Sequence, residues 1–291
     1  MHARRTHLLL FLLAALGVAC RSASAGPAMA GSDRIDAGAA EPVGIATLDM
    51  ALVKATATPP PAHTEPPLPS ACPAGMVLVE GEYCPDVEER CLEWMDPPGT
   101  HYQFFRCKRY AKPSVCKSKK RVHERFCIDE KERIEPVAEG QSAADALPLH
   151  FQSWTSAKAL CEKDGARLCL ASEWVFACEG EEMRPYPYGF ERDSNVCNAD
   201  IDHGLGKIGH LTDHRTPASA HPGCTSPFGV HDMAGNVDEW TSIDGAPRGT
   251  REVMHGSWWM PGRNSCRSYQ AGHGAYYAGA ESGARCCADA K

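Results

Sequence analysis

The sequence predicts an α+β domain of short elements and long structured loops, held together by disulfides. Fourteen of the fifteen cysteines follow residue 70, behind an apolar N-terminal segment. A high, even cysteine count in an exported chain is typical of a disulfide framework, and no Cys-x-x-Cys pair suggests a zinc ribbon. Residues 185–291 are dominated by Gly, Pro, Asn and Asp between short apolar pieces, which favours loops and short strands. We therefore expect at least five disulfides within residues 72–291.

The first twenty residues have the pattern of a signal peptide. Arg4 and Arg5 precede an almost wholly apolar stretch that is too short to span a bilayer. Residues 17–20, GVAC, resemble a bacterial lipobox in which Cys20 would carry the lipid, although Gly17 stands where leucine is usual. A small-x-small site at residues 23–25 would instead release a soluble protein. We expect an exported protein, either an outer-membrane lipoprotein or a periplasmic or extracellular one.

Composition divides the rest of the chain in two. Residues 21–70 are rich in Ala, Pro, Gly, Ser and Thr and contain no aromatic residue, which predicts a disordered tether. Residues 71–291 contain all six tryptophans and are expected to form the folded domain. The net charge of −7 and the pI near 6.0 argue against a nucleic-acid partner. No later apolar run approaches the length of a transmembrane helix.

Two strands and a cysteine-rich insertion are expected early in this domain. Residues 76–79 read as a strand that ends at a turn over residues 80–82, and residues 126–129 read as another strand. Between them, residues 84–123 carry four cysteines among charges, prolines and aromatics. We expect this segment to be an irregular insertion pinned by disulfides.

Two helices are expected in the middle of the domain. Apolar residues recur at helical spacing over residues 155–164, and Gly165 supplies the stop. A second helix is expected to begin with Ser172 as its N-cap and to end at Gly180.

The order of several short segments is informative. Residues 228–240 read FGVHDMAGNVDEW, and the other segments are GMVLV at 75–79, GARL at 165–168, SEW at 172–174, YPYG at 186–189, Asn198, HGSW at 255–258 and GARC at 283–286. In this order they resemble the formylglycine-generating enzyme, or sulfatase-modifying factor, family. The resemblance covers about residues 72–291, and it implies a C-type-lectin-like α+β fold with little regular structure.

The resemblance also implies a site that this sequence alters. Family members that oxidise a sulfatase cysteine to formylglycine hold copper between two thiolates five residues apart, and soft thiolates suit a cuprous ion. Met260 falls where the first thiolate would stand, and Cys266 is the only nearby cysteine. No two cysteines in the chain are five residues apart. We therefore do not expect copper or formylglycine-generating activity.

Two disulfides are implied by the resemblance. One family disulfide matches Cys178 with Cys266, and another matches Cys161 with Cys286. Each would close a long loop, where a crosslink is most effective in the chain-entropy model. The connectivity of the six N-terminal cysteines of the domain stays open: Cys72, Cys84, Cys91, Cys107, Cys116 and Cys127.

A structural calcium site is expected in the most specific segment. Asp232, Asn236 and Glu239 are four and three residues apart, so one helical turn would place their oxygens on one side. The resemblance implies calcium at Asn236 and Glu239, and we include Asn198 as a fourth candidate ligand. The alternative is that these side chains hydrogen-bond to backbone groups of a long loop.

Exposed aromatics suggest a ligand groove. Ser257, Trp258, Trp259 and Tyr269 fall in the segment that forms the substrate groove of the family, where aromatics could hold a peptide or the face of a sugar. Core packing is the alternative, and we favour it for Trp258.

A histidine cluster offers a different chemistry. His210, Asp213 and His214 form a His-x-x-Asp-His pattern, with His203 and His221 nearby, and two histidines and a carboxylate can hold non-haem iron. The alternative is a solvated glycine-rich loop.

Our leading interpretation is a cell-envelope binding or structural module that lacks the copper dithiolate. Its partners would be an unknown peptide or glycan and, through a lipid anchor, a membrane. The alternative is an active formylglycine-generating-type or non-haem metal oxidoreductase. A disulfide-stabilised scaffold without a ligand is a third interpretation.

Overall fold

The computed structural model describes residues 70–291 except 101–102, 203–210, 219, 244 and 246–250. The expected signal peptide, Cys20 and nearly all of the tether lie outside the described residues. In the part of the chain that is described, no helix is both long and apolar enough to cross a membrane.

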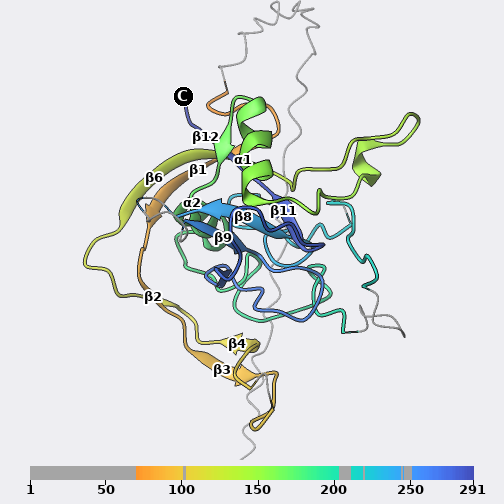
Figure 1. Ribbon diagram of the computed structural model, residues 1–291. Helices are drawn as coiled ribbons and strands as arrows, with labels where there is room; N and C mark the ends of the chain where they lie inside the picture. Colours follow the sequence, from red (N-terminus) through yellow and green to blue (C-terminus); the bar gives the residue numbers. More distant parts are fainter. Residues whose placement is uncertain (1–69, 101–102, 203–210, 219, 244, 246–250) are drawn as a thin grey trace, which may run out of the picture. The chain divides into compact units, whose positions relative to one another are not determined.

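The first sheet has four strands in the order β1-β6-β12-β7. They are β1 (Met76–Tyr83), β6 (Val122–Asp129), β12 (Cys286–Asp289) and β7 (Arg167–Leu168). The expected turn at residues 80–82 is wrong, because β6 pairs with β1 along its whole length, from Met76 opposite Asp129 to Tyr83 opposite Val122. The two strands run side by side as a long curved ribbon in Figure 1.

The second sheet has the order β10-β9-β8-β11. Its strands are β8 (Asp238–Ser242), β9 (Glu252–His255), β10 (Tyr269–Gln270) and β11 (Ser282–Ala284). Strand β8 pairs antiparallel with β9 and parallel with β11, and β10 forms one edge of the sheet. The elements are short and the connections long, as the glycine- and proline-rich composition predicts.

The two expected helices are present. Helix α1 (Trp154–Lys163) begins at a capping box in which the side chains of Ser153 and Ser156 accept hydrogen bonds from each other's backbone N–H groups. Helix α2 (Ala171–Glu179) begins one residue before the N-cap that we expected. Leu170 is its N-cap, and the carboxylate of Glu173 accepts from the Leu170 N–H at 2.8 Å. A single 3-10 turn, η1 (Ala143–Asp145), precedes these helices.

The core lies where α2 meets the two sheets. Its largest fully buried apolar side chains include Trp174 and Phe176 of α2 and Trp240 of β8. Around them pack further buried residues of both sheets and of the loop before β8: Val79, Phe126, Ile128, Val230, Met233 and Met254. Burying such side chains is the main favourable contribution to folding, at ~1.5–3 kcal/mol each.

The cysteine-rich insertion is more regular than expected. It contains two short antiparallel pairs, β2 (Val87–Glu88) with β5 (Val115–Cys116) and β3 (Cys91–Trp94) with β4 (Cys107–Tyr110). We call β3, β4 and the loop between them (residues 91–110) the Cys-rich hairpin. It lies beyond the ends of β1 and β6 (Figure 1). The expectation of an irregular segment was wrong because the disulfides join neighbouring strands and thereby fix their pairing.

All fourteen cysteines of the described residues form disulfides, in seven pairs: Cys72–Cys127, Cys84–Cys116, Cys91–Cys107, Cys161–Cys286, Cys169–Cys287, Cys178–Cys266 and Cys197–Cys224. The prediction of at least five is exceeded. Two of the seven are the pairs that the family resemblance implies. Three involve only cysteines whose connectivity the sequence left open.

Candidate functional site

A groove of about 230 Å³ opens between β8, the end of β9, β10 and the loop at residues 257–263. Three of the four predicted groove residues line it, namely Ser257, Trp258 and Tyr269. Trp259 does not, because it is only 1% exposed and packs in the interior beside Trp258. The preference for core packing at Trp258 was also wrong, since this side chain is half-buried and forms part of the groove wall.

Backbone geometry shapes the groove loop. Gly256 has a φ of 94° and Ser257 a φ of 60°, so the chain turns sharply as it leaves β9. Further along the loop, a Cβ at Gly262 would collide with the hydroxyl oxygen of Ser257. Glycine at this position therefore allows the two sides of the loop to approach each other closely.

A buried carboxyl lies at the floor of the groove. Asp238 lines the groove but is 5% exposed, and the backbone N–H of Ser257 donates to its carboxylate. Burial, with the nearby carboxylate of Glu281, raises the pKa of Asp238 to about 8. We did not identify this residue from the sequence. The available signal was strand alternation, which sends Asp238 and Glu239 to opposite faces of β8.

Replacing Asp238 by asparagine is expected to stabilise the protein above neutral pH. The pKa of Asp238 is raised in the folded state, so its stabilising contribution is complete below about pH 4 and is lost as the pH rises through about 8. Asparagine does not ionise, so the variant does not lose this stability as the pH rises. It also retains the side-chain oxygen that accepts the hydrogen bond from the backbone N–H of Ser257. Melting temperatures of parent and variant between pH 4 and 9 should diverge with rising pH, in favour of the variant. Parallel curves would contradict the assignment of a buried, proton-binding carboxyl.

The Cys-rich hairpin supplies a further wall of the groove. Phe105, two residues before β4 in the loop of the hairpin, lines the groove together with Arg263, whose guanidinium lies 4.8 Å from the centre of the phenyl ring. No local pattern indicates this contact, because the two residues are separated by most of the domain.

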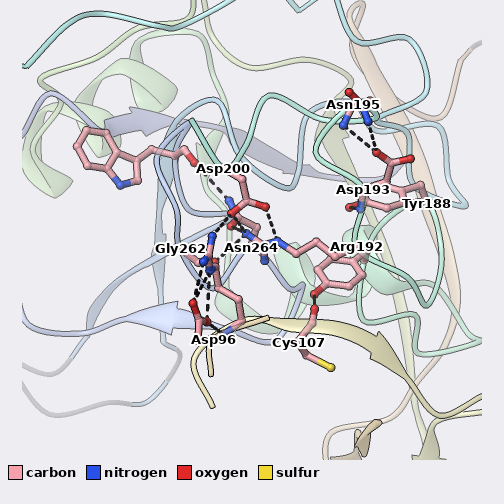
Figure 2. Close-up of polar contacts among 12 residues, drawn as sticks. Asp96, Cys107, Tyr188, Arg192, Asp193, Asn195, Asp200, Gly262 and Asn264 are labelled. Carbon is pink, nitrogen blue, oxygen red and sulfur yellow. Dashed lines mark hydrogen bonds and ion pairs between the residues drawn. The ribbon is translucent and has the colours of Figure 1, made fainter. Parts of the chain in front are cut away.

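An ion-pair network fixes this wall in place. Arg106 of the hairpin pairs with Asp96 at 2.7 Å and with Asp200 at 3.0 Å. Arg192 also binds Asp200, at 2.7 Å, and donates to the side-chain oxygen of Asn264. Figure 2 shows Arg192 and Asp200 at the centre of these contacts.

The same network reaches the groove loop. Arg192 donates to the carbonyl of Gly262 at 3.0 Å, and the amide of Asn264 donates to the carbonyl of Trp258 at 3.3 Å. The side chain of Arg192 is almost fully buried, at 4% exposure, so these bonds are shielded from water. The hairpin and the groove loop are therefore held by one continuous set of hydrogen bonds.

The predicted calcium ligand Glu239 is engaged elsewhere. One of its oxygens accepts from Nε of Arg285 at 2.7 Å and from the indole N–H of Trp174 at 2.6 Å. The other accepts from Nη2 of Arg285 at 2.6 Å. Both partners of this ion pair are almost completely buried, so the carboxylate has no oxygen free for a cation.

The expected ligands Asn236 and Asn198 also have partners, whereas Oδ2 of Asp232 is buried without a hydrogen-bond partner among the described residues. The carbonyl oxygen of Asn236 accepts from the amide of Asn198 at 2.9 Å, and its own amide donates to Glu132. Asp232 and Asn236 have φ values of 60°, so the segment does not form the helical turn that we expected. Burial raises the pKa of Asp232 to about 7, and it also raises the pKa of Glu132 well above its usual range. As arranged, Asn198, Asn236 and Glu239 are held by protein partners, and the calcium site stays a prediction.

The described residues do not fit a copper dithiolate either. Met260 is half-buried in the groove loop, and Cys266 is bonded to Cys178. In the histidine cluster, His203 and His210 lie outside the described residues. Asp213 is paired with Arg215 at 2.7 Å. Within the described ranges, no group of three or more His, Cys, Asp or Glu side chains is arranged to hold a metal ion.

The comparisons with known proteins agree on one family. The sulfatase-modifying factor enzyme 1-like domain matches residues 99–290. The inactive C-alpha-formylglycine-generating enzyme 2 of Mus musculus is 30% identical over 139 residues, which cover 43% of this chain and 42% of that protein. The formylglycine-generating enzyme of Mus musculus is 30% identical over 101 residues, or 33% of this chain and 27% of that protein. The chain thus spans less than half the length of either relative. The crystal structure of CarF aligns with a TM-score of 0.48 at 17% identity, over 75% of this chain and 99% of CarF.

Proposed function

The chain belongs to the sulfatase-modifying factor enzyme 1-like family, and from this premise we propose that it is an exported ligand-binding module that does not oxidise cysteine. The observation that carries the proposal is the state of the cysteines. All fourteen in the described residues are bonded in pairs, and methionine stands at the position of one copper-binding thiolate. A cuprous ion held by two thiolates therefore has no ligands at the family's positions.

Three further observations support the proposal, one each for binding, for the missing oxidase activity and for export. The groove has aromatic walls, a buried carboxyl and a hydrogen-bonded loop, and this combination is common in small-molecule sites. The relative from Mus musculus at 30% identity over 139 residues is itself described as inactive. Seven disulfides are consistent with an oxidising compartment and therefore with export.

The oxidase part of the proposal can be tested directly. The oxidised protein, with and without added copper, is incubated with a sulfatase-type cysteine peptide, and the peptide is analysed by mass spectrometry. We expect no formylglycine product, because Met260 cannot replace a thiolate. An active formylglycine-generating enzyme in the same buffer serves as the positive control. Copper-dependent loss of the peptide thiol, with the matching product mass, would show that the chain is an oxidase after all.

A further inference from the structure

The size of the groove limits what it can hold. Its volume of about 230 Å³ is below the roughly 300–1,000 Å³ typical of sites for drug-sized ligands. A single ring or one short side chain fits such a volume. The groove is therefore suited to one unit of a larger ligand that continues into solvent.

Aromatic side chains from three segments converge on this volume. Phe105 comes from the Cys-rich hairpin, Trp258 from the groove loop and Tyr269 from β10. Tyr269 is 63% exposed, and its ring tilts against that of His255 at 6.1 Å. Aromatic rings bury a large area at low conformational cost, and they suit ligands with flat apolar faces.

Polar groups complete the lining, and the guanidinium of Arg263 adds a positive charge beside Phe105. Asp238 brings a carboxyl, Gln270 an amide, and Ser257 and Ser268 bring hydroxyls. These groups can both donate and accept hydrogen bonds when the carboxyl is protonated. Because the pKa of Asp238 is raised to about 8, this carboxyl is mostly neutral at pH 7. The groove therefore offers many hydrogen bonds but little attraction for a cationic ligand.

The sheet edge beside the groove disfavours an extended peptide. A peptide that adds to a sheet gains its affinity from a ladder of main-chain hydrogen bonds. Strand β10 forms this edge and contains only Tyr269 and Gln270. So short an edge supports few such bonds, whereas side-chain hydrogen bonds and aromatic faces remain available.

We propose that the groove binds a sugar ring of a glycan, which stacks on Phe105 and Tyr269 and hydrogen-bonds through its hydroxyls to Asp238 and Gln270. A sugar ring combines an apolar C–H face with hydroxyls at its rim, and it matches this lining in both size and chemistry. The assignment rests on the proposed binding function and adds the ligand class. It also gives the Cys-rich hairpin a role, because Phe105 belongs to it.

The hairpin provides its own matched control. Phe104 is adjacent to Phe105 and is 53% exposed, yet it packs against Trp94 at 5.6 Å and does not line the groove. Alanine at either position removes the same phenyl group from the same segment. Only the loss of Phe105 removes a wall of the proposed site.

The experiment uses the purified, oxidised protein on an array of glycans and peptides. Titration calorimetry with cellotriose, maltotriose and chitotriose follows. We expect glycan binding on the array and measurable binding of at least one trisaccharide.

Phe105→Ala and Tyr269→Ala should each weaken this binding at least about tenfold, because each removes an aromatic face on which the sugar ring stacks. Phe104→Ala should change the affinity less than about twofold. Melting curves identify folded variants, and Phe105→Leu replaces the alanine variant if that variant is unstable.

The possible outcomes separate the two proposals. Binding of peptides but of no glycan overturns the sugar assignment and leaves the binding function standing. Absence of both kinds of ligand overturns both. Glycan binding that is unchanged by Phe105→Ala, Phe105→Leu and Tyr269→Ala would locate the sugar outside the groove and would also overturn the assignment.

Discussion

Alanine in place of Arg285 is expected to lower the free energy of unfolding by about 3–5 kcal/mol, the usual cost of removing one partner of a buried ion pair. The guanidinium is fully buried and binds both oxygens of Glu239. It also donates to the backbone carbonyls of Asp129 and His231 at 2.9 and 2.8 Å. These carbonyls belong to different parts of the domain, so Arg285 connects the end of β6 with the loop before β8.

Urea unfolding of the oxidised protein measures this effect. Arg125→Ala is the control, because Arg125 pairs with Glu80 at 3.3 Å on the surface, where such pairs contribute ~0–1 kcal/mol. A double variant, Glu239→Leu with Arg285→Met, should be less destabilised than Arg285→Ala, because it leaves no unpaired buried charge. If Arg285→Ala costs no more than Arg125→Ala, the buried pair is not the stabilising feature that the geometry indicates.

The second large effect is expected from the disulfide between Cys161 and Cys286. These residues are 125 positions apart and fully buried, and the bond joins α1 to β12. In the chain-entropy model, closing a loop of this length lowers the entropy of the unfolded chain and so stabilises the folded protein by about 4–5 kcal/mol. Replacing both cysteines by alanine should therefore cause a large decrease in the urea midpoint.

The disulfide Cys91–Cys107 is the natural comparison. It closes only 16 positions, for which the same model gives about 3 kcal/mol, and it lies within the Cys-rich hairpin. Removing it should affect the global midpoint less than removing Cys161–Cys286. The opposite order would show that native-state packing, and not loop length, dominates the contribution of these crosslinks.

Local patterns predicted the parts of the fold that local contacts determine. Helix α1 follows from apolar spacing and the stop at Gly165, and the end of α2 follows from Gly180. The end of β1 could not be predicted in this way. Gly81 reads as a turn residue, but Glu124 of β6 is available as its partner, and pairing along the whole ribbon overrides the local preference.

The residues of the candidate site also fall into two groups: those that lie in one stretch of sequence and those that long-range contacts bring in. Ser257, Trp258 and Tyr269 lie close together in the sequence and in the groove, and the resemblance pointed to them. Phe105 enters the groove because long-range contacts hold the hairpin there, among them the ion pair of Arg106 with Asp200 and the backbone hydrogen bond from Arg192 to Lys108. The expected calcium ligands are not arranged as predicted, for a related reason. The calcium prediction assumed that residues 232–239 form a helical turn, whereas Glu239 lies in a strand and binds Arg285, 46 residues later.

The register of β1 and β6 has a consequence for how this domain can vary. Tyr83 and Val122 lie directly opposite each other, so the chain leaves the sheet for the cysteine-rich insertion and returns to it at one point. Two of the seven disulfides lie wholly within the excursion, and the core packs without it. Such a segment can be lengthened, shortened or exchanged without shifting the register of the sheet. A change of ligand preference would then require only a new insertion on an unaltered scaffold.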